Sequence, residues 1–518
     1  MQLAILHYHL NRGGVTQAIL NHLEALAACP APARPERVAL VSSGRRDGWP
    51  DAAWRDRLPF DCHTITVPSL EYDTAIGADP AALAGAVEHG LVEAGFDPAS
   101  LLLHTHNHAL GKNASLPGAL ALLAGRGCRL LLQVHDFAED FRPTNYRHLM
   151  RSLRTRTAAE LAGALYPQAP GIHYATLTSR DRALLAAAGV AEDRLHVLPN
   201  PVAEWRDLPD RDEARPAVHQ RLGIDPLTRL IVYPVRGIRR KNLGEMLLHS
   251  ALAGGEACYA VTLAPVNPAE RASFDRWQSL ADTLGLGCRF DVGGAGGVGF
   301  PEAVAAADAL ITTSLAEGFG MVFLEAWLAG KPLVGRNLPE ITQDFLAAGI
   351  ALPDLHDQLR VPMDWLDRPR LRTELLELHA WACRDFGVAP PADTADRLDA
   401  LLAAGSIDFG MLPASHQSEV ITAVARRRGG AGQEIAACNA EGEWLGLDAA
   451  ISDQPIEANA ARVREVYSPA AVAEKLAGVY AAVMADTPGA PATPAATGEA
   501  VLTSFLQLDR LRPVRVEA

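Results

Sequence analysis

The sequence predicts an α/β protein with two domains, each built on a parallel β-sheet. Two observations support this prediction. The chain has 518 residues, which is more than one ordinary hydrophobic core accommodates. Short apolar runs of strand length alternate with helix-compatible stretches, and this alternation is typical of parallel sheets covered by helices on both faces. In such folds, ligands bind where the strands end.

The composition is globular and argues against several function classes. Hydrophobic residues make up 49% of the chain, and no apolar run approaches the roughly eighteen residues that a membrane-spanning helix needs. The beginning, MQLAILHYHLNRGG, lacks a basic region and reads as a first strand rather than a signal peptide. The formal net charge of −14 argues against general nucleic-acid binding. The negative net charge is compatible with a small anionic ligand, because such a ligand needs only a local pair of cations.

Cysteine usage favours a reducing compartment. The seven cysteines are odd in number, widely spaced and never arranged as Cys-x-x-Cys. We therefore expect a cytoplasmic protein.

The first half begins with a strand, a glycine loop and a helix. Met1–Leu10 has the apolar character of a strand. Gly13 and Gly14 follow, and a helix is expected from Val15 to Ala27. Such a loop lets the backbone approach a phosphate or a sugar, although an ordinary turn has the same sequence. Further strands are expected at Arg37–Ser42, Leu101–His104, Arg129–Val134 and His173–Thr178.

Histidines gather at two of these strand ends. His104, His106 and His108 alternate in the sequence HTHNH. His135 ends the run LLLQVH. Alternate residues of a strand share a face, so HTHNH with Asp136 could form a zinc site, but no fourth ligand has a telling spacing. The histidines could instead line a ligand site or be hydrogen-bonded core residues. We predict no metal site.

The segment that follows His135 is rich in arginine. Its cationic face has three interpretations, namely a solvated helix face, a site for an anionic acceptor, or a contact with an anionic membrane surface. Because Arg142 follows closely on His135, we single out an acceptor that carries a carboxylate or phosphate, with His106 and Arg142 as its candidate contacts. The arginines of the segment are Arg142, Arg147, Arg151 and Arg154, the last three at helical spacing.

The second half opens with another strand, turn and helix. Leu195–Val202 is a short strand that ends in a Pro-Asn-Pro turn, which cannot continue regular structure. Arg229–Ser250 then reads as an apolar strand, a basic turn and an amphipathic helix. Arg236 and Lys241 lie five residues apart across the basic turn.

The stretch Ala309–Glu340 contains the strongest site motif. An apolar strand leads through the turn Gly318-Phe319-Gly320 into a helix, where unpaired backbone N–H groups favour an anion. Glu317 precedes the turn and Glu325 lies inside the helix. Carboxylates at these positions suit the hydroxyl groups of a sugar.

This Glu-x7-Glu spacing around Gly-Phe-Gly resembles the nucleotide-sugar signature of the family 4 retaining glycosyltransferases, also called glycosyl transferases group 1. The resemblance covers about residues 1–345 and 459–484. It implies the GT-B fold, in which two Rossmann-like domains face a central cleft. It assigns residues 1–200 to an acceptor-side domain, with a return helix at 459–484, and 201–458 to a nucleotide-sugar-binding domain. Residues 485–518 are rich in Pro and Ala and are predicted to be a flexible tail.

The resemblance implies a metal-independent, retaining transfer of a hexose from a nucleotide diphosphate sugar to a hydroxyl acceptor. Glu325 would bind the ribose, Glu317 with the turn would bind the sugar, and two cations would neutralise the diphosphate. The first domain would complete the site. The residues expected at the donor are Gly13, Gly14, Arg236, Lys241, Glu317, Gly318, Phe319, Gly320 and Glu325, and those expected in catalysis are His135, Glu317, Arg236 and Lys241. The family more usually has Gly where this chain has Val235 and Asn242, which leaves the donor base open.

Two alternative functions follow from the same sequence. A glycoside phosphorylase has the same fold and would require inorganic phosphate. A nicotinamide-dependent oxidoreductase rests on the GxGxxG match at 294–299, which lies in mid-domain before a short helix. We expect no cofactor besides the nucleotide sugar, no nucleic-acid partner, and no transmembrane segment, with peripheral membrane contact as a less favoured possibility.

Overall fold

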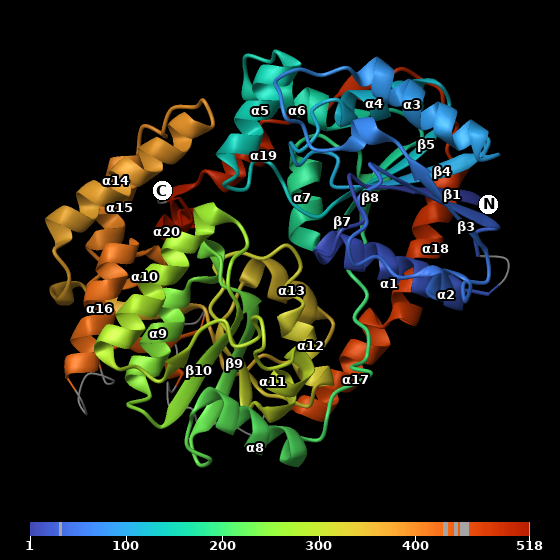
Figure 1. Cartoon of the computed structure of the whole chain (residues 1–518). Coiled ribbons are helices and arrows are strands. Elements are labelled where there is room, and N and C mark those ends of the chain that lie inside the picture. The colour runs from blue at the N-terminus through green and yellow to red at the C-terminus, as the bar shows by residue number, and fades with distance from the viewer. Residues whose placement is uncertain (31–33, 428–433, 440–443, 446–454, 517–518) are drawn as a thin grey trace. The chain divides into compact units, whose positions relative to one another are not determined.

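The computed structural model describes residues 1–30, 34–427, 434–439, 444–445 and 455–516. The chain forms two compact units, and neither is a single stretch of sequence (Figure 1). Unit 1 consists of Met1–Ala203, Ala382–Val388 and Arg464–Gln507. Unit 2 consists of Glu204–Trp381, Ala389–Val463 and Leu508–Ala518.

Unit 1 contains a seven-stranded sheet in which every paired strand is parallel. The strand order is β3-β2-β1-β4-β5-β7-β8. The strands are β1 (Gln2–Leu6), β2 (Arg37–Ser42), β3 (Asp61–Thr66), β4 (Leu101–His106), β5 (Arg129–Val134), β7 (Ile172–Thr176) and β8 (Leu195–Val197).

Helices cover both faces of this sheet, which explains why its strands are almost continuously apolar. On β1, Leu3 and Ile5 face one core cluster, while Ala4 and Leu6 face the other. The first cluster is covered by α1 (Gly14–Ala28) and α18 (Pro469–Ala485), which pack against each other. The helices of the other face and the connections are α2 (Ala52–Arg55), α3 (Pro80–Glu93), α4 (Leu116–Gly125), α5 (Pro143–Leu153), α6 (Ala158–Leu165) and α7 (Ser179–Ala187).

Unit 2 contains a six-stranded parallel sheet of order β11-β10-β9-β12-β13-β14. Its strands are β9 (Arg229–Arg236), β10 (Ala257–Leu263), β11 (Cys288–Arg289), β12 (Ala309–Thr312), β13 (Leu333–Arg336) and β14 (Leu355–His356). Its helices are α8 (Arg211–Leu222), α9 (Leu243–Leu252), α10 (Pro268–Leu284), α11 (Phe300–Ala306), α12 (Val322–Leu328) and α13 (Pro339–Ala347). The predicted α/β fold with two parallel sheets is therefore confirmed.

The region 351–450, for which the sequence predicts no site, adds a small antiparallel sheet of order β16-β15-β17-β18 to unit 2. One of its helices, α16 (Ala414–Arg426), packs against α9. Parts of this region lie outside the described residues. The elements are β15 (Gln358–Pro362), α14 (Arg368–Asp385), α15 (Thr394–Leu402), β16 (Ser406–Asp408), β17 (Ala436–Cys438) and β18 (Trp444–Leu445).

The segment 459–484, predicted as a return helix, is divided between two helices, the second of which is α18. The helix α18 follows α17 (Ile456–Tyr467), and the side chain of Ser468 caps it by accepting a hydrogen bond from Ala471 N at 3.3 Å. The border between the units falls after Ala203, close to the predicted border after residue 200.

The tail differs from its prediction. Composition predicts a flexible segment at 485–518, but β19 (Thr493–Pro494) pairs with β6 (Pro167–Gln168), and α19 (Ala500–Phe505) packs on α7. Residues 508–516, which include α20 (Pro513–Val516), belong to unit 2 instead. The reason is that apolar side chains spaced three and four residues apart, among them Val501 and Phe505, are buried. Within the described residues, no helix is long and apolar enough to span a membrane.

Candidate active site

The basic turn after β9 is held in one conformation by the residue that follows it. The chain leaves Arg236, forms a short 3-10 helix over Arg239–Lys241 and enters α9 through Asn242. Asn242 has φ 47° and ψ 59°, the left-handed region that Gly adopts freely and Asn tolerates. Its side-chain amide donates to Glu245 Oε2 at 2.9 Å. Asn242 therefore satisfies the backbone requirement that Gly more usually meets at this position.

The loop after β12 is hydrogen-bonded to this turn. Leu315 N donates to Arg240 O at 2.8 Å, and Thr313 Oγ1 donates to Lys241 O at 2.9 Å. Tyr233 OH donates to Lys241 O at 3.1 Å and lies 2.6 Å from Ser314 Oγ. These contacts place the residues after β12 beside the basic turn.

Glu317 is the centre of the resulting charge cluster. Arg240 Nη1 donates to Glu317 Oε2 at 2.6 Å and to Ala316 O at 2.7 Å. Lys241 Nζ forms an ion pair with Glu317 Oε1, which also accepts a hydrogen bond from Ser314 Oγ at 2.6 Å. Both carboxylate oxygens are thus occupied, and Glu317 joins two basic residues of the turn.

Burial and charge act in opposite directions on this cluster. Burial would raise the pKa of the Glu317 carboxyl, but Arg240 and Lys241 outweigh it and lower that pKa to about 2. Burial lowers the pKa of the Lys241 ammonium to about 8, although Glu317 opposes the change. At neutral pH, Glu317 is therefore a carboxylate and Lys241 is charged.

Lys241 and Arg240 both form ion pairs with Glu317, and the sequence analysis singled out only Lys241. The predicted contacts of Arg236 and Lys241 with a diphosphate stay predictions. Arg236 is exposed at the end of β9, where its guanidinium donates to Ala264 O at 2.9 Å. The run Arg239-Arg240-Lys241 signals a basic turn, but it does not show which side chain points at Glu317.

The Gly-Phe-Gly turn is shaped by packing. Gly320 has φ 78°, and a Cβ there would lie 2.7 Å from Phe323 Cδ2, so a larger residue would be strained and would displace Phe323. Phe319 is buried and packs edge-on against Phe345, with ring centroids 5.6 Å apart. The helix that follows is α12, and Glu325 lies in its first turn.

Glu325 contrasts with Glu317. Its side chain is partly buried, and burial raises its pKa to about 7. In the described part of the chain, no donor lies within hydrogen-bonding distance of its carboxylate, while its backbone carbonyl accepts from Trp205 Nε1 at 3.1 Å. A buried carboxylate without a donor is costly, so this group is suited to a ligand that supplies donors.

In unit 1, the predicted glycine loop is exposed and open. Gly13 precedes α1 in an extended conformation, and Gly14 begins the helix. A Cβ at Gly14 would meet no atom within 4 Å, and at Gly13 only Asn11 O at 3.9 Å. Neither glycine is required by the backbone, and their role in donor binding stays a prediction.

The histidines of unit 1 form a buried hydrogen-bonded network. His106 Nδ1 lies 2.8 Å from His135 Nε2, and His104 contacts both Tyr480 OH and Gln133 Oε1 at 2.9 Å. Desolvation by burial lowers the pKa of His135 to about 3, so its ring is neutral at pH 7. This arrangement matches the interpretation as hydrogen-bonded core histidines, and it leaves His106 fully buried.

A zinc site from these histidines is not supported by their geometry. Ring nitrogens of His22, His104 and His106 lie within 4.8 Å of one another. The rings of His104 and His106 are stacked at 4.3 Å, so their lone pairs do not converge, and both nitrogens of His104 already have partners. Asp136 instead pairs with Arg142, Oδ1 to Nη2, at 2.7 Å.

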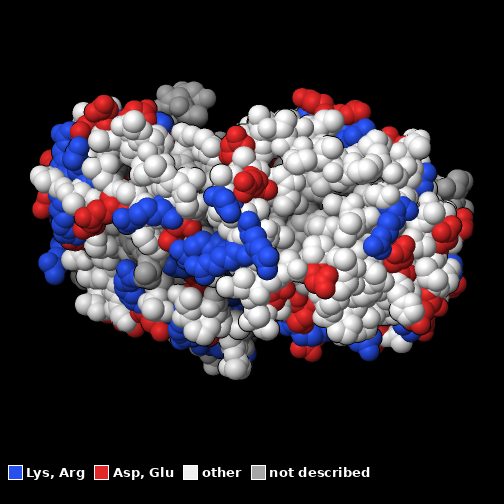
Figure 2. Space-filling model, turned by 90° about the horizontal axis from the view of Figure 1, so that it is seen from above, with Lys and Arg blue, Asp and Glu red and all other residues white. Residues whose placement is uncertain are grey.

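The arginines after His135 are divided between structural and exposed positions. Besides Asp136, Arg142 holds Phe137 O at 3.0 Å, so it braces the loop after β5. On α5, Arg147 pairs with Asp385 at 2.6 Å, while Arg151 is exposed. On the face of the molecule that Figure 2 shows, Lys and Arg side chains gather near the middle. Elsewhere on this face, basic and acidic side chains are mixed. None of the three interpretations of this segment is decided by these contacts.

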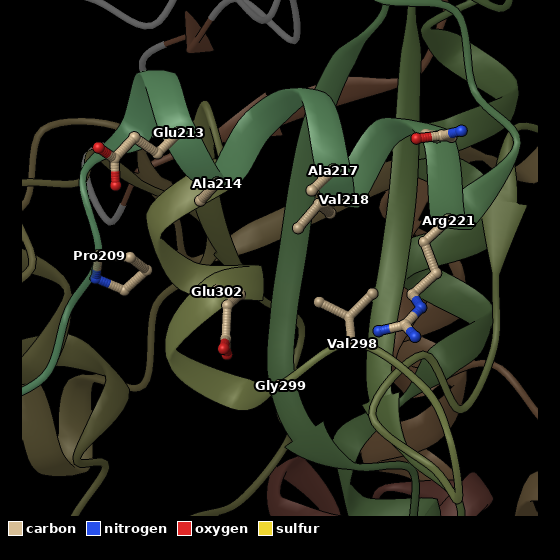
Figure 3. Close-up of a pocket in the computed structure, with 10 residues that line it drawn as sticks. Pro209, Glu213, Ala214, Ala217, Val218, Arg221, Val298, Gly299 and Glu302 are labelled. Atoms are coloured by element: carbon tan, nitrogen blue, oxygen red, sulfur yellow. The ribbon is translucent and has the colours of Figure 1, made fainter.

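The glycines of GxGxxG serve loop packing. A Cβ at Gly294 would lie 2.7 Å from Asp291 Oδ2, and one at Gly299 would lie 1.9 Å from Glu302 Oε2. The loop borders a hollow of about 520 Å³ between α8 and α11. Figure 3 shows two carboxylates, Glu213 and Glu302, and one guanidinium, Arg221, at this hollow, so the charged lining is net negative and does not suit a pyrophosphate. The oxidoreductase alternative is therefore not favoured.

Comparison with known proteins agrees with the site motifs. Residues 228–351 match the family model described as glycosyl transferases group 1. A mannosylglucosyl-3-phosphoglycerate synthase of Petrotoga mobilis is 26% identical over 356 residues, which span 66% of this chain and 66% of that protein.

Two solved structures share the fold. Anabaena HepE, crystallised with UDP and glucose, has a TM-score of 0.50 at 14% identity and covers 93% of this chain and 99% of its own. A glycosyltransferase from Rickettsia africae has a TM-score of 0.50 at 13% identity and covers 93% of this chain and 98% of its own. Within residues 228–351 this chain is thus similar to the glycosyl transferases group 1 family, and its fold is GT-B.

Proposed function

We propose that this chain is a retaining glycosyltransferase of the family 4 type, which moves a hexose from a nucleotide diphosphate sugar to a hydroxyl group of an anionic acceptor. The observation that carries the proposal is the cluster of Glu317, Arg240 and Lys241, which lies inside the stretch that matches the family.

The cluster has the charge that a diphosphate needs. Arg240 and Lys241 outnumber the single carboxylate of Glu317, so the cluster is positive, and Arg236 ends β9 on the same basic turn. No carboxylate of the described residues forms an ion pair with Arg236. Preorganised cations in a partly buried site stabilise the charge that develops on a departing diphosphate. In this proposal they do so without a metal ion.

Glu325 is assigned to the nucleoside ribose. Two neighbouring hydroxyl groups would supply the donors that its carboxylate lacks. Ligand binding would then offset the cost of burying this charge.

The carboxylate of Glu317 is not arranged as a covalent nucleophile. Each of its oxygens is engaged by at least one basic residue, so neither is free to attack the sugar. We therefore propose that retention occurs on one face of the sugar, with the leaving phosphate accepting the proton of the acceptor hydroxyl. His135 and its neighbours in unit 1 stay candidate residues of this reaction.

The acceptor class is suggested by the relative from Petrotoga. The name of that enzyme describes a product that contains a 3-phosphoglycerate group, which carries a phosphate and a carboxylate. An acceptor with the same group is the first to test here.

The proposal is tested by measuring the hydrolysis of UDP, GDP and ADP sugars without an acceptor, since slow hydrolysis identifies the donor. Release of nucleotide diphosphate from one donor, undiminished by EDTA, is expected. NMR of the glycoside formed with glucosyl-3-phosphoglycerate should then show the anomeric configuration of the donor. Inversion, or a strict requirement for inorganic phosphate, would refute the proposal, the latter in favour of a phosphorylase.

A further inference from the structure

The loop between β4 and α4 in unit 1 is rigid. Asn113 Nδ2 donates to Ser69 O at 2.8 Å and to Glu71 O at 2.9 Å. Asn145 Nδ2 donates to Leu110 O at 2.9 Å. Gly111 has φ 79°, and a Cβ there would lie 2.8 Å from Asn145 O. The residue between Gly111 and Asn113, Lys112, is therefore held in a defined place.

The side chain of Lys112 lies against an aromatic ring and has no polar partner. Its Nζ is 5.3 Å from the ring centroid of Tyr72, and its backbone carbonyl accepts from Asp73 N at 2.8 Å. Among the residues that the structure describes, no oxygen lies within hydrogen-bonding distance of this Nζ. The side chain is partly buried, and its ammonium group stays reachable from solvent.

The neighbouring cations differ from Lys112, because each of them forms an ion pair with a carboxylate. Arg45, whose guanidinium lies 5.4 Å from the same Tyr72 ring, is paired with Glu71. Arg142 is paired with Asp136. Burial lowers the pKa of Lys112, and the positive charge of Arg142 lowers it further. Lys112 is therefore a preorganised cation whose charge is not compensated by the protein.

The position in the fold favours a ligand. Lys112 follows β4, Arg142 follows β5, and Tyr72 follows β3, so all three lie beyond the carboxyl ends of parallel strands. Ligands of parallel α/β sheets bind at this edge. A lysine acts there as a point charge suited to phosphate.

We propose that Lys112 binds a phosphate group of the acceptor, with the ring of Tyr72 and the guanidinium of Arg142 beside it. This inference rests on the proposed function, because it names the residue that selects a phosphorylated acceptor. In this proposal, the acceptor contact predicted at His106, which is buried, is assigned to Lys112, whose side chain a ligand can reach.

The test uses the full chain and isothermal titration with 3-phosphoglycerate and, as the matched probe without phosphate, glycerate. We compare the wild type with Lys112→Met, which keeps the length of the apolar stem. The control is Arg126→Met, because Arg126 lies before the amino end of β5, at the other end of the strands, and pairs with Glu88. Lys241→Ala reports on phosphate bound at the donor cluster instead.

The wild type, Arg126→Met and Lys241→Ala should bind 3-phosphoglycerate alike, and glycerate at least about tenfold more weakly. Lys112→Met should lose about tenfold or more in affinity for 3-phosphoglycerate and discriminate no longer, with its melting temperature unchanged. Wild-type affinity in Lys112→Met, loss in Lys241→Ala instead, or no preference for the phosphate in the wild type would each overturn the inference. Donor hydrolysis by the wild type, measured separately, shows whether the proposed function itself fails.

Discussion

Replacing Glu325 by Gln should make the protein more stable and the donor site weaker. Burial raises the pKa of this carboxyl from 4.5 to about 7. Each tenfold change in proton affinity is worth about 1.4 kcal/mol, so the charged form costs the fold up to about 3 kcal/mol. Because the side chain is partly exposed, we expect about 1 to 3 kcal/mol.

The gain in stability from Glu325→Gln should depend on pH. Between pH 4.5 and about 7 the folded state binds more protons at Glu325 than the unfolded state, so stability falls as pH rises through this window. Glu325→Gln should therefore raise the melting temperature by about 2 to 6 °C at pH 8, and the gain should shrink toward zero as the pH approaches 4.5. The assay is calorimetric unfolding at pH 8 and pH 5, with Glu377→Gln on the exposed surface of α14 as the control.

The same substitution tests the ribose assignment. Because Glu325→Gln removes a charged hydrogen-bond acceptor, it should raise the KM for the nucleotide sugar about tenfold. A melting temperature that does not rise at pH 8, or a gain independent of pH, would refute the burial argument. A pH-dependent gain without any change in KM would show that Glu325 does not contact the donor.

Four further predictions concern the site and its support. Lys241→Ala should lower turnover about a hundredfold while the protein stays folded, and an effect of only a few fold in steady-state assays would remove Lys241 from the catalytic residues. The wild type should lose kcat/KM as the pH rises above about 8, where Lys241 loses its proton. Arg336→Met would leave Glu245 buried without the ion pair that Arg336 Nη2 makes with it at 2.8 Å, so chemical denaturation should show a loss of about 3 to 5 kcal/mol. Gly320→Ala should cost about 1 to 3 kcal/mol, because its φ is positive and its Cβ would meet Phe323; an unchanged denaturation midpoint would contradict that packing argument.

Several strands could be predicted because they are buried on both faces, whereas the partly exposed strand β3 was not predicted. β2 and β5 begin and end at the predicted residues, since each is an apolar run bounded by turns. The contacts of the charged side chains in the site were harder to predict than the strands. Which basic residues contact Glu317 depends on the folded turn: Arg240 and Lys241 form ion pairs with it, while Arg236 is exposed at the end of β9.

The tail and Lys112 could not be predicted, for related reasons. The tail is ordered by surfaces more than 300 residues away in sequence, as in the hydrogen bond from Thr497 Oγ1 to Ala187 O at 2.6 Å. Composition carries no information about such a partner. Lys112 belongs to no motif, and its importance follows only from the ring and charges that surround it.

The helix α18 has a consequence for biosynthesis. It covers one face of the sheet of unit 1, and the hydroxyl of its Tyr480 contacts His104 in the middle of the chain's first sheet. At the usual speed of translation, the ribosome needs on the order of tens of seconds to proceed from Ala203 to Tyr480. During that time the apolar side chains of β1 and α1 lack their cover. The nascent chain should therefore depend on chaperones until about its last tenth emerges, and a fragment that stops at the border between the units should aggregate.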